Sequence, residues 1–191
     1  ETMEQVLGDV EKVIIDELQG LADSYEWTLL AKRCLDLTRH HDGSARLWNY
    51  LGCAHAKQGY PRLAETAFRK SIANDPSYFA GYTNLGNALL DLDKFDEALE
   101  VHNTAAKLNP SLAETQNNLG AVYETLARYE EAFECYSEAM SLDPNYATAV
   151  YNLAGIQLRM KNFAEGWSLR EARWIEETND GWEPYIQTSR P

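Results

Sequence analysis

Small and apolar residues return at helical spacing along most of the chain. Within residues 48–56 they recur at steps of three and four, and they do so again within residues 63–72. This spacing puts them on one face of a helix, so both stretches are predicted to be amphipathic helices. Gly59 and Pro61 stand between them. A glycine just past one helix and a proline in the first turn of the next indicate a tight connection, so the pattern predicts an antiparallel helix pair.

The predicted helix pair recurs with a constant period. The step from Pro76 to Pro110 equals the step from Pro110 to Pro144, and each of these prolines follows an asparagine or aspartate. Glycine inside a helix costs about 1 kcal/mol relative to alanine, so a recurring helical glycine indicates close approach of two helices. Two further sets of small residues share the same period: Gly52, Gly86 and Gly120, each after a leucine, and Ala64, Ala98 and Ala132.

This pattern resembles the tetratricopeptide repeat (TPR), whose signature runs Trp-x-x-Leu-Gly-x-x-Tyr and then Ala, Phe, Ala and Pro over about 34 residues. The resemblance implies an all-α fold, an α-solenoid in which antiparallel helix pairs stack into a right-handed superhelix. The unit over residues 45–78 supplies Trp48, Leu51, Gly52, Ala64, Phe68 and Pro76.

We predict a single solenoid domain over residues 1–191 with about ten helices. In its last unit Ala154 stands in place of the glycine and Gly166 in place of the later alanine, so the small pair is kept with its members exchanged. The expected parts are a helical cap or degenerate repeat over 1–42, repeats over 43–76, 77–110 and 111–144, a degenerate terminal repeat over 145–178, and an irregular tail over 179–191.

The charge balance argues against two classes of partner. Thirty acidic residues against 17 basic ones give a net charge of -13, and this acidic surface repels phosphate backbones and anionic lipids. No apolar stretch is long enough to span a bilayer. We therefore expect no nucleic acid and no membrane insertion. Three cysteines without a CxxC pair favour a reducing compartment, and we predict a cytoplasmic protein.

The sequence contains no recognisable catalytic or metal-binding constellation. His55 and His102 are isolated, and nothing beside Cys53 in the sequence would make its thiolate reactive. We expect no catalytic residue, no metal and no cofactor, and we predict that this piece is not an enzyme.

The strongest candidate binding feature is a set of asparagines. Asn84, Asn118 and Asn152 stand one repeat period apart, each just before the leucine of its repeat. An asparagine amide both donates and accepts, so such a ladder can pair with successive peptide groups of an extended ligand. The repeats are similar here to those of O-linked N-acetylglucosamine transferases, where such a ladder holds peptide backbone. The alternative is that these asparagines only pack between neighbouring first helices. The predicted groove residues are Asn49, Asn84, Asn87, Asn117, Asn118 and Asn152.

The C-terminal end offers secondary contact residues. Arg159, with Lys161, is a candidate for holding an acidic group at the end of the groove. Residues 162–174 resemble the closing repeat of bacterial TPR proteins in which Glu-Gly-Trp and a later Arg-Trp precede a glycosyltransferase-like catalytic domain. Trp167 and Trp174 lie seven apart and share a helix face. They serve either packing of the last helix or docking of a further domain or second subunit.

Together these features predict a protein-protein interaction scaffold that binds an extended peptide or partner segment in its concave groove. Two alternatives stay open: the substrate-recognition arm of a larger glycosyltransferase-like enzyme, and a self-assembling scaffold.

Overall fold

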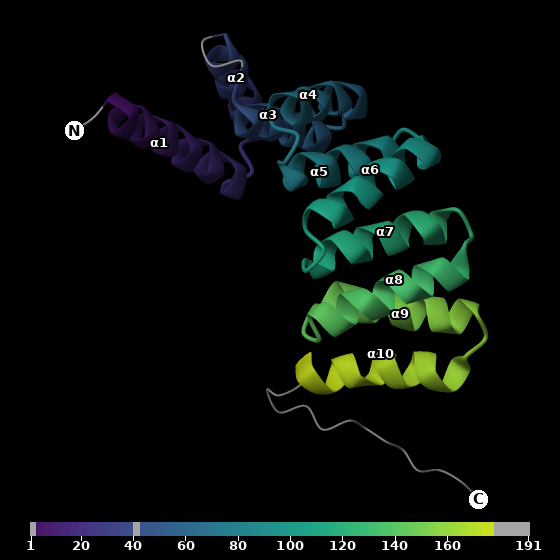
Figure 1. Cartoon of the computed structure of the whole chain (residues 1–191). Coiled ribbons are helices and arrows are strands. Elements are labelled where there is room, and N and C mark those ends of the chain that lie inside the picture. Colours follow the sequence, from purple (N-terminus) through teal and green to yellow (C-terminus); the bar gives the residue numbers. More distant parts are fainter. Residues whose placement is uncertain (1–2, 40–42, 178–191) are drawn as a thin grey trace, which may run out of the picture. The chain divides into compact units, whose positions relative to one another are not determined.

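The computed structural model describes residues 3–39 and 43–177, with side chains from 12 to 39 and from 43 to 170. Ten α-helices and no strands make up this part of the chain (Figure 1), which confirms the predicted all-α solenoid of helix pairs. The helices are α1 (Met3–Asp23), α2 (Trp27–Thr38), α3 (Ala45–Lys57), α4 (Pro61–Asn74), α5 (Phe79–Leu90), α6 (Phe95–Leu108), α7 (Ala113–Thr125), α8 (Tyr129–Leu142), α9 (Ala147–Arg159) and α10 (Phe163–Glu177).

The chain divides into two compact units, Glu1–Pro110 (unit 1) and Ser111–Pro191 (unit 2), and each is described by itself. In unit 1, α3 packs on α4 and α5 on α6, while α2 packs on α3 and α4 on α5. In unit 2, α7 packs on α8, α8 on α9, and α9 on α10. Within each unit, helices that follow one another along the chain therefore pack together, as expected of stacked helix pairs. None of the helices in the described part combines the length and apolarity that crossing a bilayer requires.

Every turn from a first to a second helix bends at the same position. Gly59 has φ 78°, and the residues one repeat period before it and at each later period also have positive φ. A residue in the left-handed conformation ends a helix within one residue, but glycine adopts this conformation at lower cost than other residues do. Only the first full repeat has glycine there, so the other turns adopt the bend despite its cost. These other residues are Tyr25 (φ 59°), Asp93 (φ 58°), Ala127 (φ 55°) and Lys161 (φ 65°).

The recurring helical glycines sit against a ring of the paired second helix. A methyl group added at Gly120 would meet the ring of Tyr136 at 2.7 Å, and one added at Gly86 would overlap the ring of His102. Gly52 faces Phe68 in the same way. The close approach predicted from the glycine period is therefore present.

The last helix pair reaches the same close approach from the opposite side. A methyl group added at Gly166 of α10 would lie 2.8 Å from the side chain of Leu158 and 3.2 Å from the carbonyl oxygen of Ala154, both on α9. The exchange of the small pair between Ala154 and Gly166, inferred from the sequence, is therefore real.

Candidate functional site

The first helices α3 and α5 of unit 1 carry two of the predicted groove residues in direct contact. The amide nitrogen Nδ2 of Asn84 donates a hydrogen bond to Oδ1 of Asn49 at 2.9 Å, and lies 3.6 Å from the Cys53 sulfur. Asn49 is only 8% exposed. Because a buried amide is costly unless it is hydrogen-bonded, this contact stabilises Asn49 and also fixes the orientation of the Asn84 amide.

Unit 2 repeats this contact between α7 and α9. Nδ2 of Asn152 donates to Oδ1 of Asn117 at 2.9 Å, and Asn117 is 4% exposed. In both units the bond joins residues 35 apart, one more than the repeat period. The two bonds are therefore the same structural feature built twice from one sequence pattern.

The bonds leave hydrogen-bonding capacity on the ladder asparagines. An amide offers two N–H groups and a carbonyl oxygen, and each bond between asparagines uses one N–H. The second N–H of Asn84 is taken up by the Cys53 sulfur, so Asn84 keeps its carbonyl oxygen, while Asn152 keeps an N–H and its carbonyl oxygen. Asn84 and Asn152 are half-buried, so their other groups are not sealed in the core. Asn118 on α7 is also half-buried and Asn87 on α5 is exposed, and neither forms a side-chain hydrogen bond within the part of the chain that the structure describes. The packing interpretation and the ligand-contact interpretation both accommodate this arrangement.

The residue at the ladder position of the first repeat is a tyrosine. Tyr50 of α3 stands one repeat period before Asn84, and its hydroxyl donates to Oε1 of Gln19 on α1 at 2.7 Å. Tyr78, at the start of α5, is close to Arg46 of α3; burial raises the pKa of Tyr78 and the nearby Arg46 acts against that rise. Sequence reasoning passed over Tyr50, although the repeat period identifies its position.

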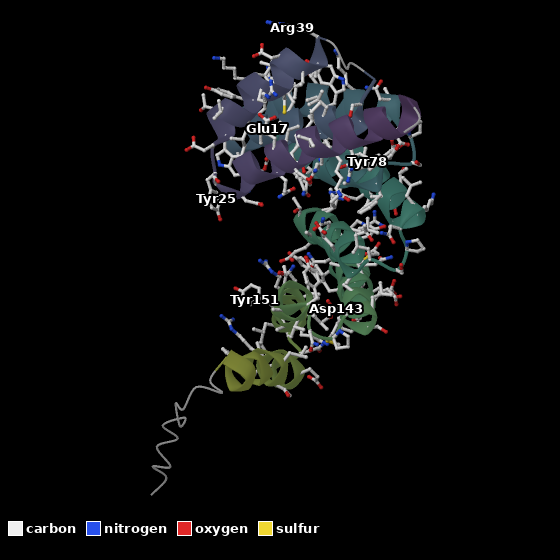
Figure 2. All side chains as sticks on the ribbon, turned by 90° about the vertical axis from the view of Figure 1, so that its left-hand side faces the viewer. Glu17, Tyr25, Arg39, Tyr78, Asp143 and Tyr151 are labelled. Carbon is white, nitrogen blue, oxygen red and sulfur yellow. The ribbon has the colours of Figure 1, made fainter. Side chains whose placement is uncertain are left out.

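The secondary residues have partners of their own. Arg159 forms an ion pair with Glu124 Oε1 at 3.1 Å, and the Tyr136 hydroxyl donates to Glu124 Oε2 at 2.9 Å. An acidic group of a partner would therefore compete with Glu124 for Arg159. The guanidinium of Arg170 lies 5.7 Å from the centre of the Trp167 ring and 5.8 Å from that of Tyr151, which Figure 2 labels on α9. The side chain of Trp174 lies outside the described residues.

The buried titratable groups are held in their neutral forms. Burial raises the pKa of Cys53 to about 11 and that of Cys34 to about 12, so both thiols stay protonated at neutral pH. Burial lowers the pKa of His102 to about 4. These buried neutral groups therefore serve packing.

Two family models match the chain. Both are described as tetratricopeptide repeat, one over residues 45–78 and the other over residues 77–145, and together they span more than half of the chain. The chain belongs to the tetratricopeptide repeat family. Among curated proteins, no sequence matches this TPR protein.

Solved structures share its fold. MamA (residues 41 to the end) from Desulfovibrio magneticus RS-1 is 20% identical with a TM-score of 0.76, over 89% of this chain and 97% of that one. Pseudomonas aeruginosa PilF is 17% identical with a TM-score of 0.78, over 86% and 75%. A thermophilic TPR protein of Thermus thermophilus is 19% identical with a TM-score of 0.75, over 89% and 93%. At these identities the likeness is one of fold, and the fold is typical of protein-interaction scaffolds.

Proposed function

We propose that this TPR protein is an interaction scaffold that binds an extended partner segment along its first helices, with the ladder asparagines pairing to the backbone of the segment. The observation that carries the proposal is the repeated bond from Asn84 to Asn49 and from Asn152 to Asn117. It fixes the orientation of the Asn84 and Asn152 amides and leaves the carbonyl oxygen of each to accept from a peptide N–H. Asn152 also keeps one N–H to donate to a peptide carbonyl, whereas the second N–H of Asn84 is directed at the Cys53 sulfur.

Orientation matters because an amide that rotates freely loses entropy when it binds. Asn49 and Asn117 are buried, and each bond from a ladder asparagine holds that amide in one rotamer before any partner arrives. Preorganised donors and acceptors bind more tightly for the same contacts, since less ordering remains to be done. Asn49 and Asn117 are therefore positioning residues in this proposal, while Asn84, Asn118 and Asn152 contact the partner.

The test is a comparison of two asparagine variants in affinity capture from a lysate of the source organism. The first variant carries Asn84→Ala, Asn118→Ala and Asn152→Ala. The control carries Asn103→Ala on α6 and Asn145→Ala in the turn before α9, which removes asparagines from outside the ladder. Circular dichroism first establishes that both are folded. A partner captured by the parent chain and the control but lost from the ladder variant supports the proposal, whereas equal capture by all three proteins contradicts it.

One alternative makes the same groove the substrate-recognition arm of a larger glycosyltransferase-like enzyme. The asparagine ladder and the run from Glu165 to Trp167 favour it, since both resemble the repeats of such enzymes. The parent reading frame separates the two functions. Several hundred further residues with an α/β pattern would favour the enzyme arm, and a stop codon soon after Pro191 would favour the scaffold.

A second alternative is self-assembly. Its support is the last helix, where Phe163 is 58% exposed and Trp167 is 53% exposed. Two large apolar side chains on one helix are typical of a contact surface. Light scattering over a hundredfold range of concentration tests this alternative: self-assembly predicts a mass that rises with concentration, and a constant monomer mass contradicts it.

A further inference from the structure

A cavity of about 370 Å³ opens between the second helices α8 and α10, with α9 as its floor. It lies wholly within unit 2, and none of the ladder asparagines lines it. This volume is at the lower end of the range for ligand pockets. The lining residues are Phe133, Ser137 and Met140 of α8, Leu153 and Gln157 of α9, and Glu165, Ser168 and Leu169 of α10.

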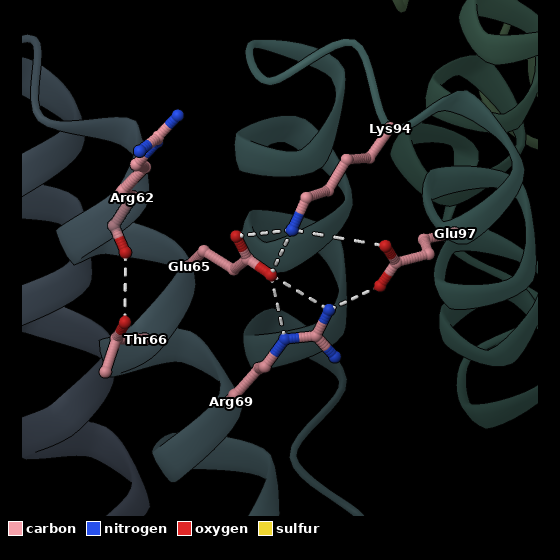
Figure 3. A network of polar contacts seen from close by, with 6 residues as sticks. All are labelled: Arg62, Glu65, Thr66, Arg69, Lys94 and Glu97. Atoms are coloured by element: carbon pink, nitrogen blue, oxygen red, sulfur yellow. Dashed lines mark hydrogen bonds and ion pairs between the residues drawn. The ribbon is translucent and has the colours of Figure 1, made fainter.

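The equivalent gap in unit 1, between α4 and α6, is bridged by charged side chains (Figure 3). Nζ of Lys94 lies 2.9 Å from Oε1 of Glu65, and Nη2 of Arg69 lies 2.6 Å from Oε2 of Glu97. Arg69 and Glu65 also pair with each other at 3.0 Å. Four charges thus link α4 to the start of α6.

Two repeats later, three of these four positions have lost their charge. A shift by two repeat periods takes Glu65 to Phe133, Arg69 to Ser137, Lys94 to Asn162 and Glu97 to Glu165. The α8 side has become a ring and a small hydroxyl, so no ion pair can close the gap there. Glu165 alone keeps its carboxylate, and it forms no ion pair within the described side chains.

The cavity therefore combines an apolar interior with an unpaired negative charge at its mouth. Leu153 is buried at the floor, and Phe133, Met140 and Leu169 line the walls as part of the same apolar cluster. At the rim, Oε1 of Gln157 accepts from Nδ2 of Asn162 at 2.7 Å, which leaves the Gln157 N–H groups for a ligand carbonyl.

We propose that this cavity is a second docking site, for a partner protein segment that inserts an apolar side chain and carries a lysine or arginine beside it. The apolar side chain is desolvated against Phe133 and Leu153, and the cation pairs with Glu165. Charge complementarity favours a cationic partner. A carboxylate is the only charged group among the described residues that line the cavity, and the whole chain carries a net charge of -13.

The direct test uses three blocked peptides and the full chain labelled for NMR. The probe is acetyl-Gly-Leu-Arg-Gly-amide, and the controls replace its arginine by glutamate or its leucine by glycine. We expect the probe to shift the resonances of α8, α9 and α10 around the cavity, with at least fivefold weaker effects from either control. Shifts spread over the whole surface, no shifts at millimolar probe, or equal shifts from the glutamate peptide would overturn the proposal.

Variants of the cavity supply a second, independent test. Phe133→Glu, Ser137→Arg and Asn162→Lys together rebuild the unit 1 network around Glu165, and should weaken probe binding more than tenfold by closing the cavity.

Should the triple variant fail to fold by circular dichroism, Glu165→Gln serves in its place, with Glu138→Gln on the far side of α8 as the charge-matched control. Because Glu165→Gln removes one surface ion pair with the probe, we expect about two- to fivefold weaker binding. Glu138→Gln should bind the probe with unchanged affinity. Equal affinities in both variants contradict the proposal. The ladder asparagine variant should bind the probe as the parent chain does, which separates this site from the one on the first helices.

Discussion

Replacing His102 by phenylalanine should stabilise unit 1. The imidazole is 0% exposed, and neither of its ring nitrogens has a hydrogen-bond partner. A buried polar group without a partner costs about 1–3 kcal/mol. The same position in the neighbouring repeats holds Phe68 and Tyr136, each against its own glycine as His102 is against Gly86. A phenyl ring therefore fits the site, and after some loss from repacking we expect His102→Phe to raise the free energy of unfolding by about 1–2 kcal/mol.

The effect should grow as the pH falls. Burial lowers the pKa of His102 to about 4 in the folded protein, whereas the ordinary value is 6.5. Below pH 6.5 the unfolded chain binds a proton that the folded chain does not, so folding stability falls until the pH reaches about 4. Between pH 7.5 and pH 5 this linkage removes about 2 kcal/mol from the parent protein, and none of it from the phenylalanine variant.

Urea denaturation followed by circular dichroism at both pH values measures the two effects. The pKa of His55 is also lowered by burial, but His55 is present in both proteins, so the difference between them isolates His102. The expected result is a variant that is more stable at pH 7.5, with a gap that widens by about 2 kcal/mol at pH 5. A variant less stable at pH 7.5, or a gap that stays constant with pH, would refute the reasoning.

Two further predictions concern the turns and the ion-pair network. Ala127 has φ 55°, so Ala127→Gly should stabilise unit 2 by about 1 kcal/mol, whereas the same change at Ala121 inside α7 should destabilise it by a similar amount; equal effects in thermal unfolding would contradict this. Partial burial acts to raise the pKa of Glu65, but hydrogen bonds from Lys94 and Arg69 outweigh it and hold the pKa below its usual value. Glu65→Gln should therefore lower stability at pH 7 by about 1 kcal/mol, with the deficit shrinking in 1 M salt and as the pH falls below the ordinary pKa of glutamate; a deficit insensitive to both would count against the network.

The repeat architecture was predictable because it depends on the spacing of residues within short segments of the chain. Helical periodicity and the constant steps of glycine and proline are properties of a single chain segment, and the close approach at Gly120 follows from the absence of a side chain there. Even the irregular last pair was foreseeable, since Ala154 and Gly166 still provide one small residue on each helix.

The bonds between repeats were not predictable to the same degree. The step of 35 that joins Asn84 to Asn49 depends on how far one helix is shifted along its neighbour, which no sequence period states. The left-handed turns were visible only at Gly59, because Ala127 and Lys161 carry no sequence signature for that conformation. The role of His102 had a signal that went unused, as it lies one repeat period after Phe68.

The cavity between α8 and α10 shows a further limit. The repeat period tells which positions correspond to Glu65 and Arg69, but it does not tell that ion pairs form across them in unit 1 and that Phe133 and Ser137 line a cavity in unit 2.

The most direct test of backbone recognition by the ladder asparagines is an N-methylation scan of a bound peptide. A peptide selected from a random library against the full chain is remade with each backbone N–H methylated in turn, and separately with each side chain cut to alanine, and dissociation constants are measured by calorimetry. The account predicts that methylation at spaced positions weakens binding about tenfold each, or about 1.4 kcal/mol, while most alanine changes have smaller effects. It also predicts that these methylation effects disappear when Asn84, Asn118 and Asn152 are replaced by alanine. Binding that tolerates every N-methyl group, or that loses the same affinity to methylation with and without the ladder, would contradict the account.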